Sequence, residues 1–92
     1  MRTVYKYAIE RIESKGELTL MLPSDAVIVH VGIDPNGKVC IWCELDPERP
    51  QVPRQLYVKA TGDPIEDGLR HIGSFVNPPF VWHVYQSRWI QG

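Results

Sequence analysis

The chain has 92 residues, of which 43% are hydrophobic and 23% are charged, a composition typical of one globular domain. Ten basic and eleven acidic residues give a net charge of -1, without the basic excess of a nucleic-acid-binding surface, so we expect no nucleic acid partner. No apolar run approaches the about 18 residues that span a bilayer, and no apolar signal segment follows the first residues. We therefore expect a single domain over residues 1–92 that does not enter a membrane and stays in the cytoplasm.

Hydrophobic residues alternate with a period of two through the first half of the chain, which predicts half-buried β-strands. The first two strands fall near residues 4–9 and 18–22 and are predicted to pair as a hairpin across a turn at Glu13–Gly16. Two β-branched runs follow at residues 26–33 and 38–45, and Asn36-Gly37 lies between them. Asn-Gly between two such runs is a strong hairpin signal, because both residues tolerate positive φ.

The second half continues the strand pattern with one interruption. Residues 46–53 hold three prolines and predict a loop, and residues 55–60 predict a strand. Asp63, Pro64 and Glu66 stand where a helix N-terminus favours them, so we expect one short helical turn near residues 64–70. Strands are expected again at residues 71–76 and 80–86, joined through Asn77-Pro78-Pro79. The predicted fold is mostly β, a β-rich α+β domain of six or seven antiparallel strands in a small sandwich or barrel.

Reactive groups do not gather into a recognisable catalytic motif. Cys40 and Cys43 have Cys-x-x-Cys spacing, but in a strand their side chains point to opposite faces, so we expect two packed thiols rather than a redox or zinc pair. No two of the three histidines have metal-motif spacing. The serines lie in no nucleophile context, and glycine-rich phosphate loops are absent from the sequence. We expect no enzyme activity, no catalytic residues, no metal site and no cofactor.

Polar and aromatic side chains supply the candidate binding residues. Tryptophan, tyrosine and arginine are over-represented among residues that carry binding energy. The candidates combine the segment from the expected helical turn with the aromatic last strand and the tail: Asp63, Glu66, Asp67, Arg70, His71, Trp82, His83, Tyr85 and Trp89. The alternative is that the aromatic rings fill the core or the interface of a homodimer, which a chain of this length often forms to bury more surface.

Several segments resemble a family of small proteins of unknown function that phages and prophages encode. They are Arg2–Tyr7, Gly37–Trp42, Thr61–Asp67, His71–Phe75 and Phe80–Tyr85, and together they span nearly the whole chain. The resemblance implies a phage or prophage origin and a site of action in the bacterial cytoplasm. Members of the family often carry a histidine where Asp63 stands and an acidic residue where Gly68 stands, so the chemistry of that loop differs here.

Three functions remain open from the sequence. The first is a phage or prophage accessory protein that binds a host or phage protein, for example to modulate a host defence system. The second is an oligomeric protein that binds a small ligand or nucleotide, for which Arg54, Arg70, His71, Trp82 and His83 are suitable residue types. The third is a structural or assembly component of the virion.

Overall fold

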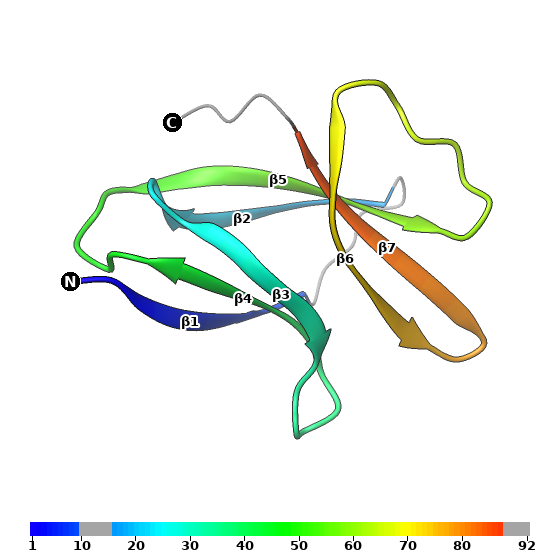
Figure 1. The fold of residues 1–92 in the computed structure, drawn as a ribbon, viewed down its shortest axis with the longest axis horizontal. Helices are drawn as coiled ribbons and strands as arrows, with labels where there is room; N and C mark the ends of the chain where they lie inside the picture. The colour runs from blue at the N-terminus through cyan, green and yellow to red at the C-terminus, as the bar shows by residue number, and fades with distance from the viewer. Residues whose placement is uncertain (10–15, 88–92) are drawn as a thin grey trace.

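The computed structural model describes residues 1–9 and 16–87, which form two antiparallel β-sheets. The strands are β1 (Thr3–Ala8), β2 (Glu17–Pro23), β3 (Val27–Ile33), β4 (Val39–Leu45), β5 (Gln51–Ala60), β6 (Leu69–Asn77) and β7 (Phe80–Ser87). One sheet has the order β1-β4-β3 and the other β2-β5-β7-β6, and neither closes on itself (Figure 1). The prediction of a mostly β fold is confirmed, and the described part is a sandwich of two open sheets.

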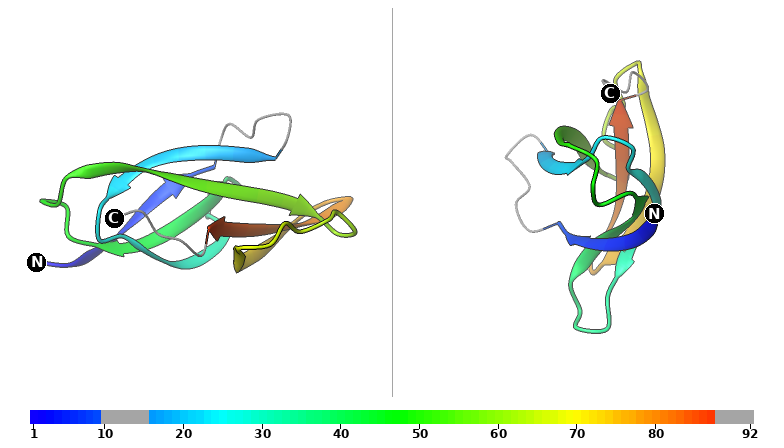
Figure 2. Two further views of the ribbon diagram at one scale, coloured as in Figure 1. Left: turned by 90° about the horizontal axis from the view of Figure 1, so that it is seen from above. Right: turned by 90° about the vertical axis from the view of Figure 1, so that its left-hand side faces the viewer.

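The core lies between the two sheets, where alternate side chains of their strands meet. Leu22, Ile41, Leu45, Leu56 and Val84 are completely buried. The shortest dimension of the molecule is 19 Å, which suits two sheets packed about 10 Å apart with side chains on their outer faces (Figure 2). Each sheet therefore has one face committed to the core and a second face that can carry other side chains.

The strand pairing confirms one of the two predicted hairpins and corrects the other. β3 pairs with β4 around the turn at residues 34–38, where Gly37 has φ +82° and the Asp34 carboxylate accepts hydrogen bonds from the backbone N–H groups of Asn36 and Lys38. The predicted pairing of the first two strands is wrong: β1 pairs with β4, and β2 pairs with β5. β2 buries Leu18 and Leu22 in the core, whereas β1 is mostly exposed and only Tyr7 and Ala8 at its end are partly buried.

The predicted helical turn near residues 64–70 is also wrong, because the structure has no helix among the residues it describes. β5 and β6 follow each other in the chain, yet β7 lies between them in the sheet, so residues 61–68 must cross from the end of β5 to the far end of β7 (Figure 1). Extended chain covers about 3.3 Å per residue and a helix only about 1.5 Å, so an eight-residue connection makes this crossing in extended form. Asp63 caps the turn after β5 instead: its carboxylate accepts the N–H of Ala60. No helix in the described residues is long and apolar enough to cross a membrane.

The two sheets approach each other most closely where β6 passes β3. A Cβ atom added to Gly73 would lie 2.7 Å from the side chain of Val31, far inside ordinary contact distance. The absence of a side chain at residue 73 thus lets β6 rest on β3, and it fixes the position of β6, which carries part of the candidate site.

Candidate functional site

Polar side chains from β6, β7 and the end of β5 form a hydrogen-bonded chain on the outer face of the four-stranded sheet. The Ser74 hydroxyl lies 2.9 Å from Nε2 of His71 and 2.7 Å from Nδ1 of His83. Nε2 of His83 lies 2.9 Å from the hydroxyl of Thr61, which is 3.4 Å from the carbonyl oxygen of Val81. We call this set, His71, Ser74, His83 and Thr61, the histidine cluster.

A β-bulge assembles the histidine cluster. Ser74 lies directly opposite His83, whereas His71 lies opposite Tyr85, because the register between β6 and β7 shifts at residues 71–73. Without the shift, strand alternation would place His71 and Ser74 on opposite faces of the sheet, since they are three residues apart. Bulges often re-aim a side chain next to a functional site. Here the bulge brings the second imidazole to the same hydroxyl as the first.

Aromatic and charged groups surround the histidine cluster on the same face. The ring of Tyr85 packs edge-on against His71 with centroids 5.3 Å apart, and Tyr57 lies opposite Tyr85 on β5. Lys59 lies opposite His83, and its ammonium group pairs with Glu66 at 3.0 Å. The hydrogen bond from Lys59 holds the pKa of the Glu66 carboxyl below its usual value. This contact ties the crossing loop to the outer face of the sheet.

Two of the four predicted loop residues, Glu66 and Asp67, lie on the same face. Glu66 and Asp67 line a shallow hollow of about 370 Å³ with Glu17 and Tyr57. Arg70 is exposed at the start of β6, and Asp63 is engaged in its turn. The structure therefore groups His71, His83, Tyr85, Glu66 and Asp67 on one face.

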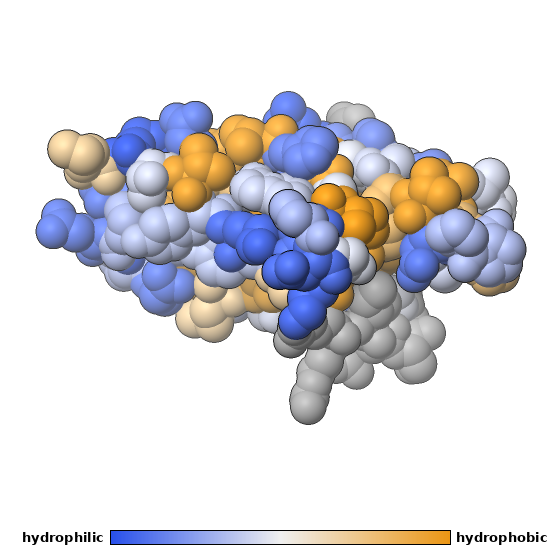
Figure 3. Space-filling model, turned by 90° about the horizontal axis from the view of Figure 1, so that it is seen from below, coloured by the Kyte–Doolittle hydropathy of each residue, from blue (hydrophilic) through white to orange (hydrophobic). Residues whose placement is uncertain are grey.

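Trp82 points to the other side of β7 and lines an apolar hollow of about 200 Å³ at the end of the sandwich. The other lining residues are Ile9, Val39, Phe75 and Asn77. We call this the end hollow. The hairpin between β6 and β7 rises beside it, and its Val76, Phe80 and Val81 are strongly exposed, with the Phe80 ring 5.6 Å from that of Trp82. We call these three residues the hairpin tip. On the face shown in Figure 3, hydrophobic groups form small patches separated by hydrophilic ones rather than one broad apolar surface.

The remaining candidate residues do not contribute to a functional site in the described part of the chain. Trp89 lies outside the described residues. Cys40 and Cys43 are free thiols buried on opposite faces of β4, and burial raises the pKa of Cys43 to about 11. No group of three or more His, Cys, Asp or Glu side chains that could hold a metal ion occurs within residues 1–9 and 16–87.

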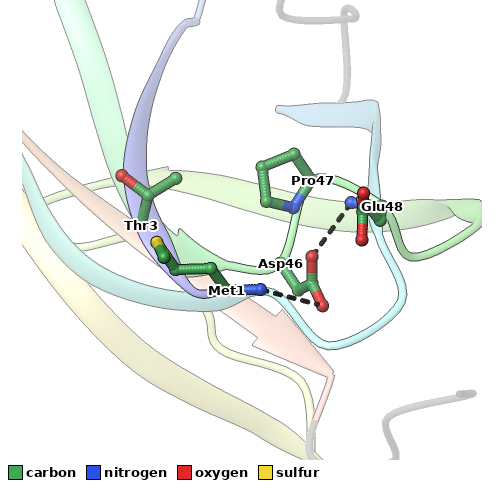
Figure 4. Close-up of a pocket in the computed structure, with 5 residues that line it drawn as sticks. All are labelled: Met1, Thr3, Asp46, Pro47 and Glu48. Atoms are coloured by element: carbon green, nitrogen blue, oxygen red, sulfur yellow. Dashed lines mark hydrogen bonds and ion pairs between the residues drawn. The ribbon is translucent and has the colours of Figure 1, made fainter.

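A third recess lies beside the first residue, between Met1, Thr3, Asp46, Pro47 and Glu48, with a volume of about 510 Å³ (Figure 4). One carboxylate oxygen of Asp46 accepts the N–H of Glu48, and the other lies 3.8 Å from the terminal amino group of Met1 (Figure 4). Both oxygens are engaged with the chain itself, so we do not place the functional site there.

Comparison with known protein families decides what the chain belongs to. A family model described as a domain of unknown function, DUF7352, matches residues 1–90. The chain is a member of the DUF7352 family. No significant match is found among curated proteins or among solved structures. The DUF7352 match covers nearly the whole chain and assigns no activity, so only the surfaces of this DUF7352 protein bear on its function.

Sequence reasoning missed several residues of both surfaces. Ser74 and Thr61 complete the histidine cluster, and Val76, Phe80 and Val81 form the hairpin tip. Counting outward from the turn at Pro78-Pro79 pairs Asn77 with Phe80 and Ser74 with His83, so Ser74 had a signal in the sequence. The sequence has no signal for the bulge that brings His71 into the histidine cluster.

Proposed function

We propose that this DUF7352 protein is a small, non-enzymatic accessory protein of a phage or prophage that binds a host or phage protein in the bacterial cytoplasm. The origin and the compartment rest on the sequence resemblance described above. The binding role rests on one structural observation, the exposed hairpin tip beside the end hollow. A component of a host defence system is one class of partner that the phage setting suggests.

The hairpin tip has the features of a protein-binding anchor. Phe80 is 54% exposed, although an aromatic ring of this size is usually buried, and Val76 and Val81 flank it on the other side of the hairpin. The neighbouring end hollow is lined mainly by apolar side chains and is open enough to receive an apolar side chain from a partner. Interfaces concentrate their binding energy in a few such aromatic groups at a well-packed centre.

Affinity capture from bacterial and infected-cell lysates tests the proposal. The wild-type protein should retain the same partner in repeated experiments, and excess free protein should compete it away. Phe80→Asp should lose the partner. Met21→Asp is a matched control, because Met21 is also 54% exposed but lies on β2. Failure to retain any reproducible partner, or equal retention by Phe80→Asp, would count against a binding site at the hairpin tip.

A second candidate function is the binding of a small ligand such as a nucleotide on the outer face of the four-stranded sheet. The observation that favours it is the gathering of two imidazoles, two hydroxyls and the ring of Tyr85 within one hydrogen-bonded and stacked set. A bound ligand should raise the melting temperature by mass action. A thermal-shift panel of mono-, di- and cyclic nucleotides at millimolar concentration that gives no stabilisation would eliminate it.

We also propose that the protein forms a homodimer. Exposed strand edges are normally blocked by charged residues or proline. β1, β2 and β6 each carry such a residue, namely Lys6, Glu17 with Pro23, and Arg70, whereas β3 carries neither a charge nor a proline and leaves Val27 and Val29 exposed. A sedimentation mass of two chains at micromolar concentration, reduced to one chain by Val27→Lys, is the expected result, and a single-chain mass for the wild type would refute it.

A further inference from the structure

The histidine cluster brings two imidazole nitrogens to one hydroxyl oxygen on an open surface. Nε2 of His71 and Nδ1 of His83 lie 2.9 Å and 2.7 Å from the same oxygen atom, the Ser74 hydroxyl. The two imidazoles come from neighbouring strands that pair along their length, and the bulge in β6 turns both toward that oxygen. Imidazole nitrogen is the ligand that zinc, copper and nickel ions share.

The hydrogen bond that Nε2 of His83 makes with Thr61 supports a metal-binding role for Nδ1, the other ring nitrogen. The Thr61 hydroxyl donates to the carbonyl oxygen of Val81, so it accepts from Nε2–H of His83. We assign the proton of the neutral His83 ring to Nε2 on this basis, which leaves the lone pair of Nδ1 directed toward Ser74. The Ser74 hydroxyl therefore donates to Nδ1 of His83 and accepts from Nε2–H of His71. Metal-ligating histidines characteristically donate their other N–H in this way, because the bond fixes the tautomer and the ring orientation.

We propose that His71, Ser74 and His83 bind one divalent transition-metal ion of the zinc, nickel or copper type. The ion replaces the two hydrogen bonds of Ser74, and His71 binds it as the tautomer that carries its proton on Nδ1. The two imidazole nitrogens and the serine hydroxyl oxygen lie on the protein side of the ion, and water or a ligand from another molecule completes its coordination on the open side. The ring centroids are now 6.3 Å apart, and the exposed His71 side chain can rotate to bring both nitrogens to the about 2.0–2.1 Å of a metal–nitrogen bond. Lys59, which lies opposite His83, is already paired with Glu66.

This site is separate from the proposed partner-binding surface. None of its three residues belongs to the hairpin tip or lines the end hollow. Loss of metal binding would therefore leave the capture of a protein partner unaffected, and the two proposals succeed or fail independently.

Titration of the tag-free, metal-free protein with zinc or nickel chloride, followed by calorimetry, tests the proposal. His30 provides a matched control, because it is the third histidine and packs against Trp42 in the other sheet, with ring centroids 5.1 Å apart. We expect one ion per chain for the wild type and for His30→Gln, and at least about tenfold weaker binding for His71→Gln and His83→Gln. Thr61→Val should weaken binding by about 10-fold or more through the orientation of His83. Magnesium chloride, whose ion prefers oxygen ligands, should give no heat of binding.

Side-chain NMR of the wild type gives a readout that depends on no variant. Addition of zinc should shift the imidazole signals of His71 and His83 and leave those of His30 in place. No binding by the wild type at millimolar zinc or nickel would overturn the proposal. So would equal loss of affinity in all three histidine variants, unchanged affinity in His71→Gln and His83→Gln, or a zinc-induced shift confined to His30.

Discussion

Replacement of Gly73 by alanine should destabilise the protein, because the new methyl group would collide with Val31 where β6 passes β3. The added Cβ would lie 2.7 Å from Cβ and Cγ2 of Val31, while carbon atoms in favourable contact stay about 3.5–4.0 Å apart. Both contacting atoms belong to a buried, β-branched side chain, which has little rotamer freedom to move aside. Overpacking of this kind costs about 1–3 kcal/mol. We expect Gly73→Ala to lower the free energy of unfolding by that amount.

Gly32→Ala is the matched control for this experiment. Its new Cβ would also come close to a neighbour, at 2.8 Å, but the neighbour is Nε2 of His30, the far end of an exposed side chain that can swing away. Alanine is otherwise preferred to glycine in a strand. Gly32→Ala should therefore change the stability little or increase it.

Urea denaturation followed by circular dichroism measures both variants, and the double variant Gly73→Ala/Val31→Ala tests the cause. Val31→Ala removes Cγ2 and leaves Cβ, so it relieves one of the two close contacts, and the double variant should lose less stability than the sum of the two single changes. A Gly73→Ala protein as stable as the wild type, or a strictly additive double variant, would refute the close approach of β6 to β3.

Two further predictions concern buried groups. The Asp34 carboxylate, whose side chain is 2% exposed, accepts hydrogen bonds from Lys6 and from backbone N–H groups, and these contacts, the one from Lys6 first, hold its pKa below the usual value. A lowered folded-state pKa contributes stability above the unfolded pKa of about 3.9 that is lost as the pH falls through the folded pKa. Asp34→Asn should therefore lower the melting temperature at pH 7 and flatten its decline below pH 4, and an unchanged pH profile would contradict this. Burial raises the pKa values of Cys40 and Cys43, so neither thiol should react with a disulfide reagent at pH 8 until urea is added; rapid reaction of either thiol in the native protein would show that it is accessible.

Local patterns in the sequence predicted the strands well, because alternation and turn residues act over a few positions. The Asn36-Gly37 turn and the β3–β4 hairpin illustrate this. The predicted pairing of the first two strands was wrong, because no local pattern in either segment indicates that β1 pairs with β4 and β2 with β5. The helical turn failed for a similar reason: the capping residues after Thr61 favour a helix locally, but the position of β7 between β5 and β6 requires an extended crossing.

The candidate site was predictable in part for the same reason. The alternation in the last strand placed His83 and Tyr85 on one face and Trp82 on the other, as the structure shows. The joining of His71 to that face depends on a bulge, which a strict period of two cannot predict. The exposure of Phe80 depends on where the sandwich ends, which is a property of the packed sheets rather than of residue 80 and its neighbours.

The affinity of the protein for its captured partner, compared between the wild type and Phe80→Ala, tests the central claim most directly. Truncation of an aromatic hot-spot residue costs about 2 kcal/mol or more, which corresponds to about 30-fold in the dissociation constant. We predict a loss of this size for Phe80→Ala in isothermal titration calorimetry and a change of less than about twofold for Met21→Ala, which is equally exposed on β2. Equal affinities for the wild type and Phe80→Ala, or an equal loss in Met21→Ala, would contradict partner binding through the hairpin tip.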